Sequence, residues 1–231
     1  MFRRRMKQRS TRVGILLLLL LFIAVFMVSC VAGTNPLWIQ GLFGADIKAY
    51  AGEETLAMRA EDSAEVAEMC ATLRMLVGNG THLEPFRNSS QAVNLYRDRI
   101  LNAMLGEGYL RYSGDSAASA AVAATDPQLS ACLLIPAADF ESTVVRLFGA
   151  GEVSNKSGEY FTYLSRSGYY TIPVEPWTSP VSIAVLSCEE TANAFRLSFV
   201  LEDESEVSDS YTAYFVKRSD GSFYLRGLEN A

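Results

Sequence analysis

Hydrophobic and polar positions divide the chain into three regions with different periodicities. Residues 13–33 form an uncharged apolar run, VGILLLLLLFIAVFMVSCVAG. Between residues 53 and 148, apolar positions recur every three or four residues, a spacing that indicates amphipathic helices. From residue 160 onward, apolar and polar positions alternate, which indicates strands with one wet face. The pattern therefore predicts an apolar N-terminal segment, then helices, then a sheet.

The apolar run is long enough to cross a membrane. A helix rises about 1.5 Å per residue, so roughly 20 apolar residues span a hydrocarbon core of about 30 Å. Residues 1–12 carry six basic residues and no acidic residue. The positive-inside rule therefore predicts that residues 1–12 are a cytoplasmic tail and that the rest of the chain is extracytoplasmic. We expect a cell-membrane protein that is held by residues 13–33.

The end of the apolar run leaves three interpretations open. An uncleaved signal anchor would give a single-pass transmembrane protein. Alternatively, the sequence MVSC at residues 27–30 resembles a lipobox, the end of a bacterial lipoprotein signal, in which a cysteine that follows a small residue receives the lipid. That resemblance implies lipidation of Cys30 and loss of the apolar segment. Ordinary signal-peptide cleavage is the third interpretation.

The remaining chain divides into a tether and one domain. Residues 34–52 contain one proline and three glycines among apolar and aromatic positions, and we predict a tether there. Residues 53–231 are numerous enough for a domain with its own hydrophobic core.

Helices are predicted in the first half of the domain. Apolar stripes place them at residues 53–77, 90–105 and 136–148. In the second helix, residues 97–99 (RDR) are expected to form the solvated side. The alanine-rich residues 116–125 are either a short helix or a packed loop.

Strands are predicted mainly in the second half. A serine- and glycine-containing turn at residues 165–168 lies between two tyrosine-rich runs and is typical of a hairpin. Asp220 and Gly221 indicate a second hairpin near the C-terminus. The predicted strands are residues 130–135, 160–163, 169–172, 181–188, 195–202, 211–217 and 223–226.

This element order predicts an α+β fold in which helices pack on an antiparallel meander sheet. In layout it resembles the NTF2-like and cystatin-like folds, where a curved sheet wraps a helical layer. The resemblance rests on element order alone, and such folds carry many unrelated functions.

Charge differs sharply between the tail and the domain. The whole chain has a net charge of −6, but without the six basic residues of the tail the remainder has 14 basic and 26 acidic residues, a net charge of −12. A surface of that charge repels phosphate backbones and anionic lipid headgroups. We therefore expect no nucleic-acid partner.

Few residues are available for metal or nucleophilic chemistry. His82 is the only histidine, and Cys70, Cys132 and Cys188 show no paired spacing. We expect buried free thiols, with one disulfide as the alternative, and neither a metal site nor a cofactor. The acidic run at residues 202–206 lacks the glycine and the spaced ligands of a calcium loop, so a solvated loop is expected.

Aromatic residues of the first hairpin are the best candidates for ligand binding. Tyrosine combines a large rigid face with a hydroxyl group that can bind peptides or sugars. Packing within strands is the alternative role of such residues. The candidates are Tyr160, Tyr163, Tyr169, Tyr170 and Trp177.

These features favour a membrane-tethered extracytoplasmic binding or interaction protein. Its partner would be another envelope protein, a peptide or a cell-wall fragment. A carboxylate-dependent cell-envelope hydrolase is an alternative, although no catalytic residue is identified. A structural or assembly subunit of an envelope complex is a second alternative.

Overall fold

The computed structural model describes seven stretches of the chain. They are residues 47–78, 81–105, 116–125, 133–149, 153–172, 180–204 and 207–231. All belong to one compact unit, Asp46–Ala231. The predicted tail, the apolar segment with Cys30, and most of the predicted tether lie outside these stretches, as do Cys132 and Trp177. None of the described helices has the length and apolar character needed to cross a membrane.

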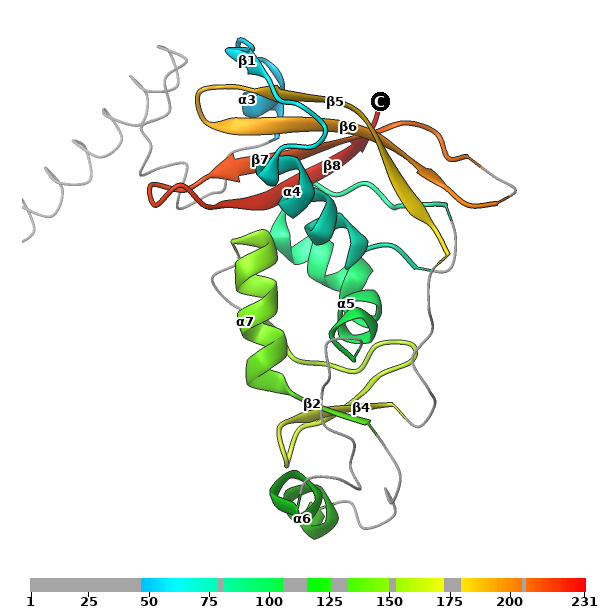
Figure 1. Cartoon of the computed structure of the whole chain (residues 1–231). Helices are drawn as coiled ribbons and strands as arrows, with labels where there is room; N and C mark the ends of the chain where they lie inside the picture. Colours follow the sequence, from blue (N-terminus) through cyan, green and yellow to red (C-terminus); the bar gives the residue numbers. More distant parts are fainter. Residues whose placement is uncertain are drawn as a thin grey trace, which may run out of the picture. The chain divides into compact units, whose positions relative to one another are not determined.

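The unit has an α+β fold with antiparallel sheets and a few helices, which confirms the predicted class (Figure 1). The strands form two sheets, whereas we predicted one. The larger sheet contains, in spatial order, β1 (Ala57–Met58), β5 (Ser182–Glu190), β6 (Ala194–Glu202), β7 (Tyr211–Lys217) and β8 (Phe223–Asn230). The smaller sheet contains, in spatial order, β2 (Leu133–Pro136), β4 (Tyr169–Ile172) and β3 (Thr162–Leu164).

The second sheet arises because the tyrosine-rich hairpin does not join the meander. Its strand β4 pairs with β2 in the register Leu133↔Ile172 to Pro136↔Tyr169. The strands β5 to β8 form the predicted meander without the hairpin. The C-terminal hairpin is confirmed, since Gly221 has a φ of 87° and the Asp220 carboxylate accepts a hydrogen bond from the Ser222 backbone N–H.

The described helices match the predicted ones except at the start of the domain. They are α3 (Lys48–Ala51), α4 (Ala64–Arg74), α5 (Ser89–Leu105), α6 (Ser116–Thr125) and α7 (Ala137–Phe148). The prediction of one helix over residues 53–77 was wrong in its first half. The Ser63 side chain caps α4 by accepting a hydrogen bond from the Val66 N–H. The residues before it run along the edge of β5, where Leu56 N–H donates to the Glu190 carbonyl at 2.8 Å.

Part of the predicted tether packs on the domain. Ile47 is completely buried, and a Cβ built on Gly227 of β8 would lie 2.3 Å from its Cγ2. The Arg196 guanidinium of β6 donates to the Ala51 carbonyl at 2.7 Å. The Glu53 carboxylate accepts a hydrogen bond from the Thr191 hydroxyl beyond β5. Residues 47–53 therefore cross the larger sheet from β8 toward the β5–β6 turn.

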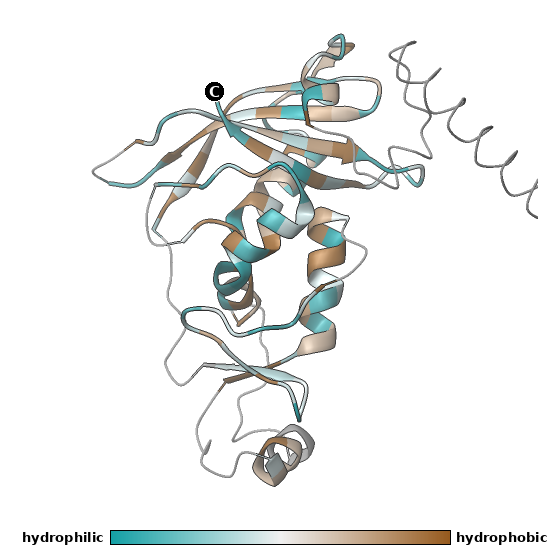
Figure 2. Ribbon diagram, turned by 180° about the vertical axis from the view of Figure 1, so that it is seen from behind, coloured by the Kyte–Doolittle hydropathy of each residue, from teal (hydrophilic) through white to brown (hydrophobic). Residues whose placement is uncertain are grey.

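The main core lies where α4, α5 and α7 contact the larger sheet. In Figure 2 these helices carry hydrophobic and hydrophilic residues on the same helix, as expected of amphipathic elements. The predicted stripe of α5 is confirmed, because Val93, Tyr96, Ile100 and Met104 are all buried. A second, smaller cluster joins α6 to the smaller sheet; it contains Val122, Leu134, Leu164 and Tyr169.

The solvated side predicted for α5 was wrong at Arg97. This residue is only 3% exposed, whereas its neighbours Asp98 and Arg99 are half-buried. The reason is that residues 153–160 cover this side of the helix. The Asp98 carboxylate accepts hydrogen bonds from the backbone N–H groups of Glu159 and Tyr160.

Candidate functional site

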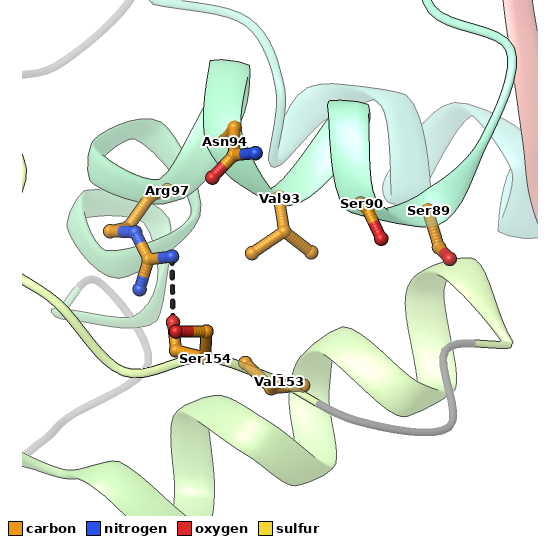
Figure 3. Close-up of a pocket in the computed structure, with 7 residues that line it drawn as sticks. All are labelled: Ser89, Ser90, Val93, Asn94, Arg97, Val153 and Ser154. Atoms are coloured by element: carbon orange, nitrogen blue, oxygen red, sulfur yellow. Dashed lines mark hydrogen bonds between the residues drawn. The ribbon is translucent and has the colours of Figure 1, made fainter.

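A small pocket of about 110 Å³ opens between α5 and the segment that follows α7 (Figure 3). Five lining residues come from α5 at spacings of three or four residues, which places them on one face of the helix. The other two face them from the segment after α7. The lining residues are Ser89, Ser90, Val93, Asn94, Arg97, Val153 and Ser154.

Among the lining residues that the structure describes, Arg97 alone carries a charged side chain. Its Nη1 donates to the Tyr170 hydroxyl at 2.7 Å, and its Nη2 donates to the Ser154 carbonyl at 2.9 Å. The guanidinium carbon lies 5.4 Å from the centre of the Phe140 ring, a cation–π distance. A guanidinium has five N–H donors, so these two bonds leave three of them without a protein acceptor in the described part of the chain.

The charge of Arg97 also has no direct counter-ion among the described residues. The ion pairs found there join other residues. A buried charge is costly unless it is paired or hydrogen-bonded. Arg97 is stabilised by neutral oxygens and an aromatic face, so a bound anion would supply the direct charge compensation that the described residues lack at this point.

A chain of hydrogen bonds holds Arg97 in place from behind. The Tyr170 hydroxyl accepts from Arg97 and donates to the Asn155 Oδ1 at 2.9 Å. Asn155 in turn donates through Nδ2 to the Glu141 carboxylate on α7. Burial raises the pKa of Tyr170, against the opposing effect of the Arg97 charge. The hydroxyl therefore keeps its proton at neutral pH and fills both roles.

The structure distributes the predicted tyrosines over different environments. Tyr170 is completely buried, and its ring centre lies 5.1 Å from that of half-buried Tyr163. Tyr169 packs against the smaller cluster, because neighbouring residues of a strand face opposite sides. Tyr160 is 54% exposed. Trp177 lies outside the described residues. Ligand binding by these residues stays a prediction, but Tyr170 contributes to the pocket by positioning Arg97.

Sequence reasoning missed Arg97, although its spacing carried a signal. Arg97 follows Val93 by four residues and precedes Ile100 by three, so it occupies a position of the buried stripe. Its partner Ser154 has no sequence signal of its own, since it lies in irregular structure after α7.

Other candidate chemistry is weaker. His82 is exposed and lies in a loop. Cys70 and Cys188 are free and buried, which confirms the prediction for these two thiols. Burial raises the pKa of both, and that of Cys188 reaches about 11, so neither is an activated thiolate. Within the described stretches, no group of three or more His, Cys, Asp or Glu residues has an arrangement that holds a metal ion.

The pocket therefore offers a guanidinium, hydroxyls and an amide around an apolar floor formed by buried Val93. Such groups bind and orient an anionic group, and they include no nucleophile–base pair. Comparisons with protein-family models, with curated proteins and with solved structures find no match for this chain.

Proposed function

We propose that this chain is a membrane-tethered extracytoplasmic binding protein and that the pocket beside Arg97 binds a carboxylate at the end of its ligand. The observation that carries this proposal is the buried guanidinium, which has spare donors and no direct counter-ion in the described residues. Arginine suits this role because its planar fork matches the two oxygens of a carboxylate.

The size of the pocket favours one end of a ligand. Sites that enclose a whole small molecule usually have about 300–1,000 Å³, and this pocket has about 110 Å³. A carboxylate with a small neighbouring group fits such a volume. Exposed Ser90 and Asn94 lie at the rim, where they can bind the next polar group of the ligand. A peptide with a free C-terminus has this chemistry.

The charge of the domain also limits the ligand. With a net charge of −12 for the chain beyond residue 12, long-range repulsion disfavours ligands with several negative charges. A single carboxylate on an otherwise neutral or basic chain suffers less repulsion. Among the ligands expected from the sequence, a peptide fits this requirement better than a polyanionic fragment.

Residues 1–33 support the location. Six basic residues precede an uncharged apolar run, and the acidic domain follows it. Protease added to intact cells should digest the domain, and survival of the domain would contradict this orientation. Mass spectrometry of the N-terminus distinguishes a retained anchor from lipidation at Cys30, because lipidation removes the residues before it.

The pocket supports a hydrolase less well than a binding protein. A carboxylate-dependent hydrolase needs two acidic side chains across a cleft, and the lining residues supply hydroxyl, amide and guanidinium groups instead. An NTF2-like or cystatin-like arrangement of the helices on the meander remains part of the proposal. Its support is the element order of α4 and α5 followed by β5 to β8.

The binding proposal is tested with two forms of one peptide. Acetylated trialanine with a free carboxylate should bind the full chain in detergent, and the same peptide with a C-terminal amide should bind at least about tenfold more weakly, a difference of about 1.4 kcal/mol. Isothermal titration measures both affinities. Equal affinities, or no binding of the acid, would refute the carboxylate assignment.

Variants locate the binding. Arg97→Lys keeps the charge but loses the fork, so it should weaken binding of the acid form, whereas Arg99→Lys on the same helix should not. Circular dichroism checks that both variants fold. Asn94→Ala tests the rim without touching a buried residue.

A further inference from the structure

Among the described strands, only β1 covers the outer edge of β5, and it does so only in part. In the larger sheet β5 lies between β1 and β6, but β1 pairs only with Glu189 and Glu190. Arg59 N–H extends this contact by donating to the Cys188 carbonyl at 2.8 Å. Residues 182–185 and Ser187 pair with β6 on one side (Figure 1), and no described strand pairs with residues 182–187 on the other.

An uncovered strand edge presents backbone N–H and C=O groups that another strand can pair with. Natural edges are usually protected by charged residues or by proline. Residues 182–187 read SIAVLS and contain neither. A bulge between Val185 and Ser187 is the one protective feature found along this edge in the described residues.

Apolar side chains continue along the same edge. Leu186 is 56% exposed at the bulge, and the neighbouring strand β1 adds Met58 at 62%. The register places Met58 opposite Glu189, three residues along β5 from Leu186. Ile183 and Val185 of the same strand are partly buried against the main core. The edge therefore combines backbone pairing with hydrophobic contact.

Charge is uneven along the edge. At the Cys188 end, Glu189 and Glu190 form ion pairs with Arg196, Arg59 and Lys217. At the opposite end, Ser182 pairs with Glu202, which is followed by Asp203 and Glu204. The ion pairs found in the described residues do not include Glu202 or Glu204. Glu202 and Glu204 therefore give this end negative charge that no ion pair among the described residues neutralises.

We infer that residues 182–187 of β5 are a docking edge for an extended segment of a partner protein, which adds one strand to the larger sheet. The segment has alternating apolar residues and places lysine or arginine beside residues 202–204. Strand addition of this kind gives affinity through backbone hydrogen bonds and selectivity through side chains. This inference does not depend on the pocket at Arg97.

A basic partner explains the edge better than a second copy of this chain. Two copies would each bring a net charge of −12 beyond the tail, and their repulsion opposes pairing of the two edges. A basic segment is attracted instead, and its lysines extend past the Ser182 end of β5 toward Glu202 and Glu204, at the end of the neighbouring strand β6.

The probe is a peptide that alternates valine and threonine and carries two lysines at one end. It is acetylated and amidated, so it offers no carboxylate to Arg97, and failure here is distinct from failure of the pocket proposal. Two matched peptides carry glutamates in place of the lysines, or proline at a central position. Each is labelled and titrated with the full chain in detergent by fluorescence anisotropy.

The lysine peptide should bind at least about tenfold more tightly than either matched peptide, a difference of about 1.4 kcal/mol. Hydrogen exchange should slow at residues 182–187 when it binds. Leu186→Lys should weaken binding by about tenfold through charge on the edge. The matched control is Leu95→Lys, which replaces an exposed leucine that lies on α5 and not on β5. It should leave binding unchanged.

Any one of four results would overturn the inference. The lysine peptide would not bind saturably, or its protection from exchange would fall elsewhere. Leu186→Lys and Leu95→Lys would have equal effects. Residues 182–187 would already be protected from hydrogen exchange without peptide. Protection at all protein concentrations would mean that another segment of the chain covers the edge, and protection that increases with protein concentration would mean that a second copy covers it.

Discussion

Replacing Ile47 by alanine should destabilise the domain, although the sequence places this residue in a tether. Ile47 is completely buried against β8, and the change removes three carbon atoms. At about 0.8 kcal/mol for each buried carbon, the loss of burial is about 2.4 kcal/mol. The cavity left behind adds to this, so the free energy of unfolding should fall by about 2–5 kcal/mol.

Gly227 allows a sharper form of this test. A Cβ at this position would lie 2.3 Å from Ile47 Cγ2 and 3.1 Å from the Phe86 carbonyl oxygen. Gly227→Ala alone should therefore cost about 1–3 kcal/mol through overpacking. In the double variant, the new methyl group occupies space that the Ile47 side chain has left. The loss of stability in the double variant should then be smaller than the sum of the two single losses by at least about 1 kcal/mol.

Urea unfolding followed by far-UV circular dichroism measures these differences on residues 46–231. Ala49→Ser, an exposed change in the same short helix, is the matched control and should have an effect within about 0.5 kcal/mol. If Ile47→Ala has an effect as small as this control, residue 47 does not pack on the domain. If the two losses add within about 0.5 kcal/mol, Ile47 and Gly227 are not in contact.

Three other results are expected. Gly149 ends α7 with a φ of 61°, and a Cβ there would lie 2.8 Å from the Tyr224 ring, so Gly149→Ala should lower the free energy of unfolding by about 1–3 kcal/mol in thermal denaturation. Burial raises the pKa of Glu53, but hydrogen bonds from the β5–β6 turn outweigh it and bring the pKa below the ordinary 4.5. The contribution of Glu53 to the free energy of unfolding is thus complete above pH 4.5 and is lost as the pH falls through the folded-state pKa. Glu53→Gln should therefore flatten the acid dependence of the free energy of unfolding, as measured by urea unfolding. Cys70 and Cys188 are buried thiols of raised pKa, so a thiol reagent at neutral pH should label them only after denaturation.

The sheet of the C-terminal half could be predicted because its determinants are local. In β6, Phe195, Leu197, Phe199 and Leu201 alternate with less buried residues, and all four are buried. A period of two residues specifies both the strand and its inner face. The hairpin at Asp220 likewise depends on two neighbouring residues. Such features need no knowledge of the rest of the fold.

The start of the domain could not be predicted in the same way. Residues 53–63 contain many helix-forming residues, and local propensity favours continuing α4 backwards through them. In the structure their partners lie far along the chain. The Glu53 carboxylate binds Thr191 and Asn193, which are 138 and 140 residues away, and residues 57 and 58 pair with β5. These tertiary contacts override the local preference.

The burial of Arg97 depends both on a local sequence pattern and on contacts far along the chain. It shows how much of a site can be predicted from the sequence. Its position in the stripe of α5 was visible, but a charged residue at such a position is usually assigned to the solvated side. Burial became favourable only through partners 57 and 73 residues away, the Ser154 carbonyl and the Tyr170 hydroxyl. Tyr170 was itself predicted to bind a ligand, and in the structure its hydroxyl accepts a hydrogen bond from the arginine. The pocket therefore follows from a pairing of two features that were each visible in the sequence, and only the fold brings them together.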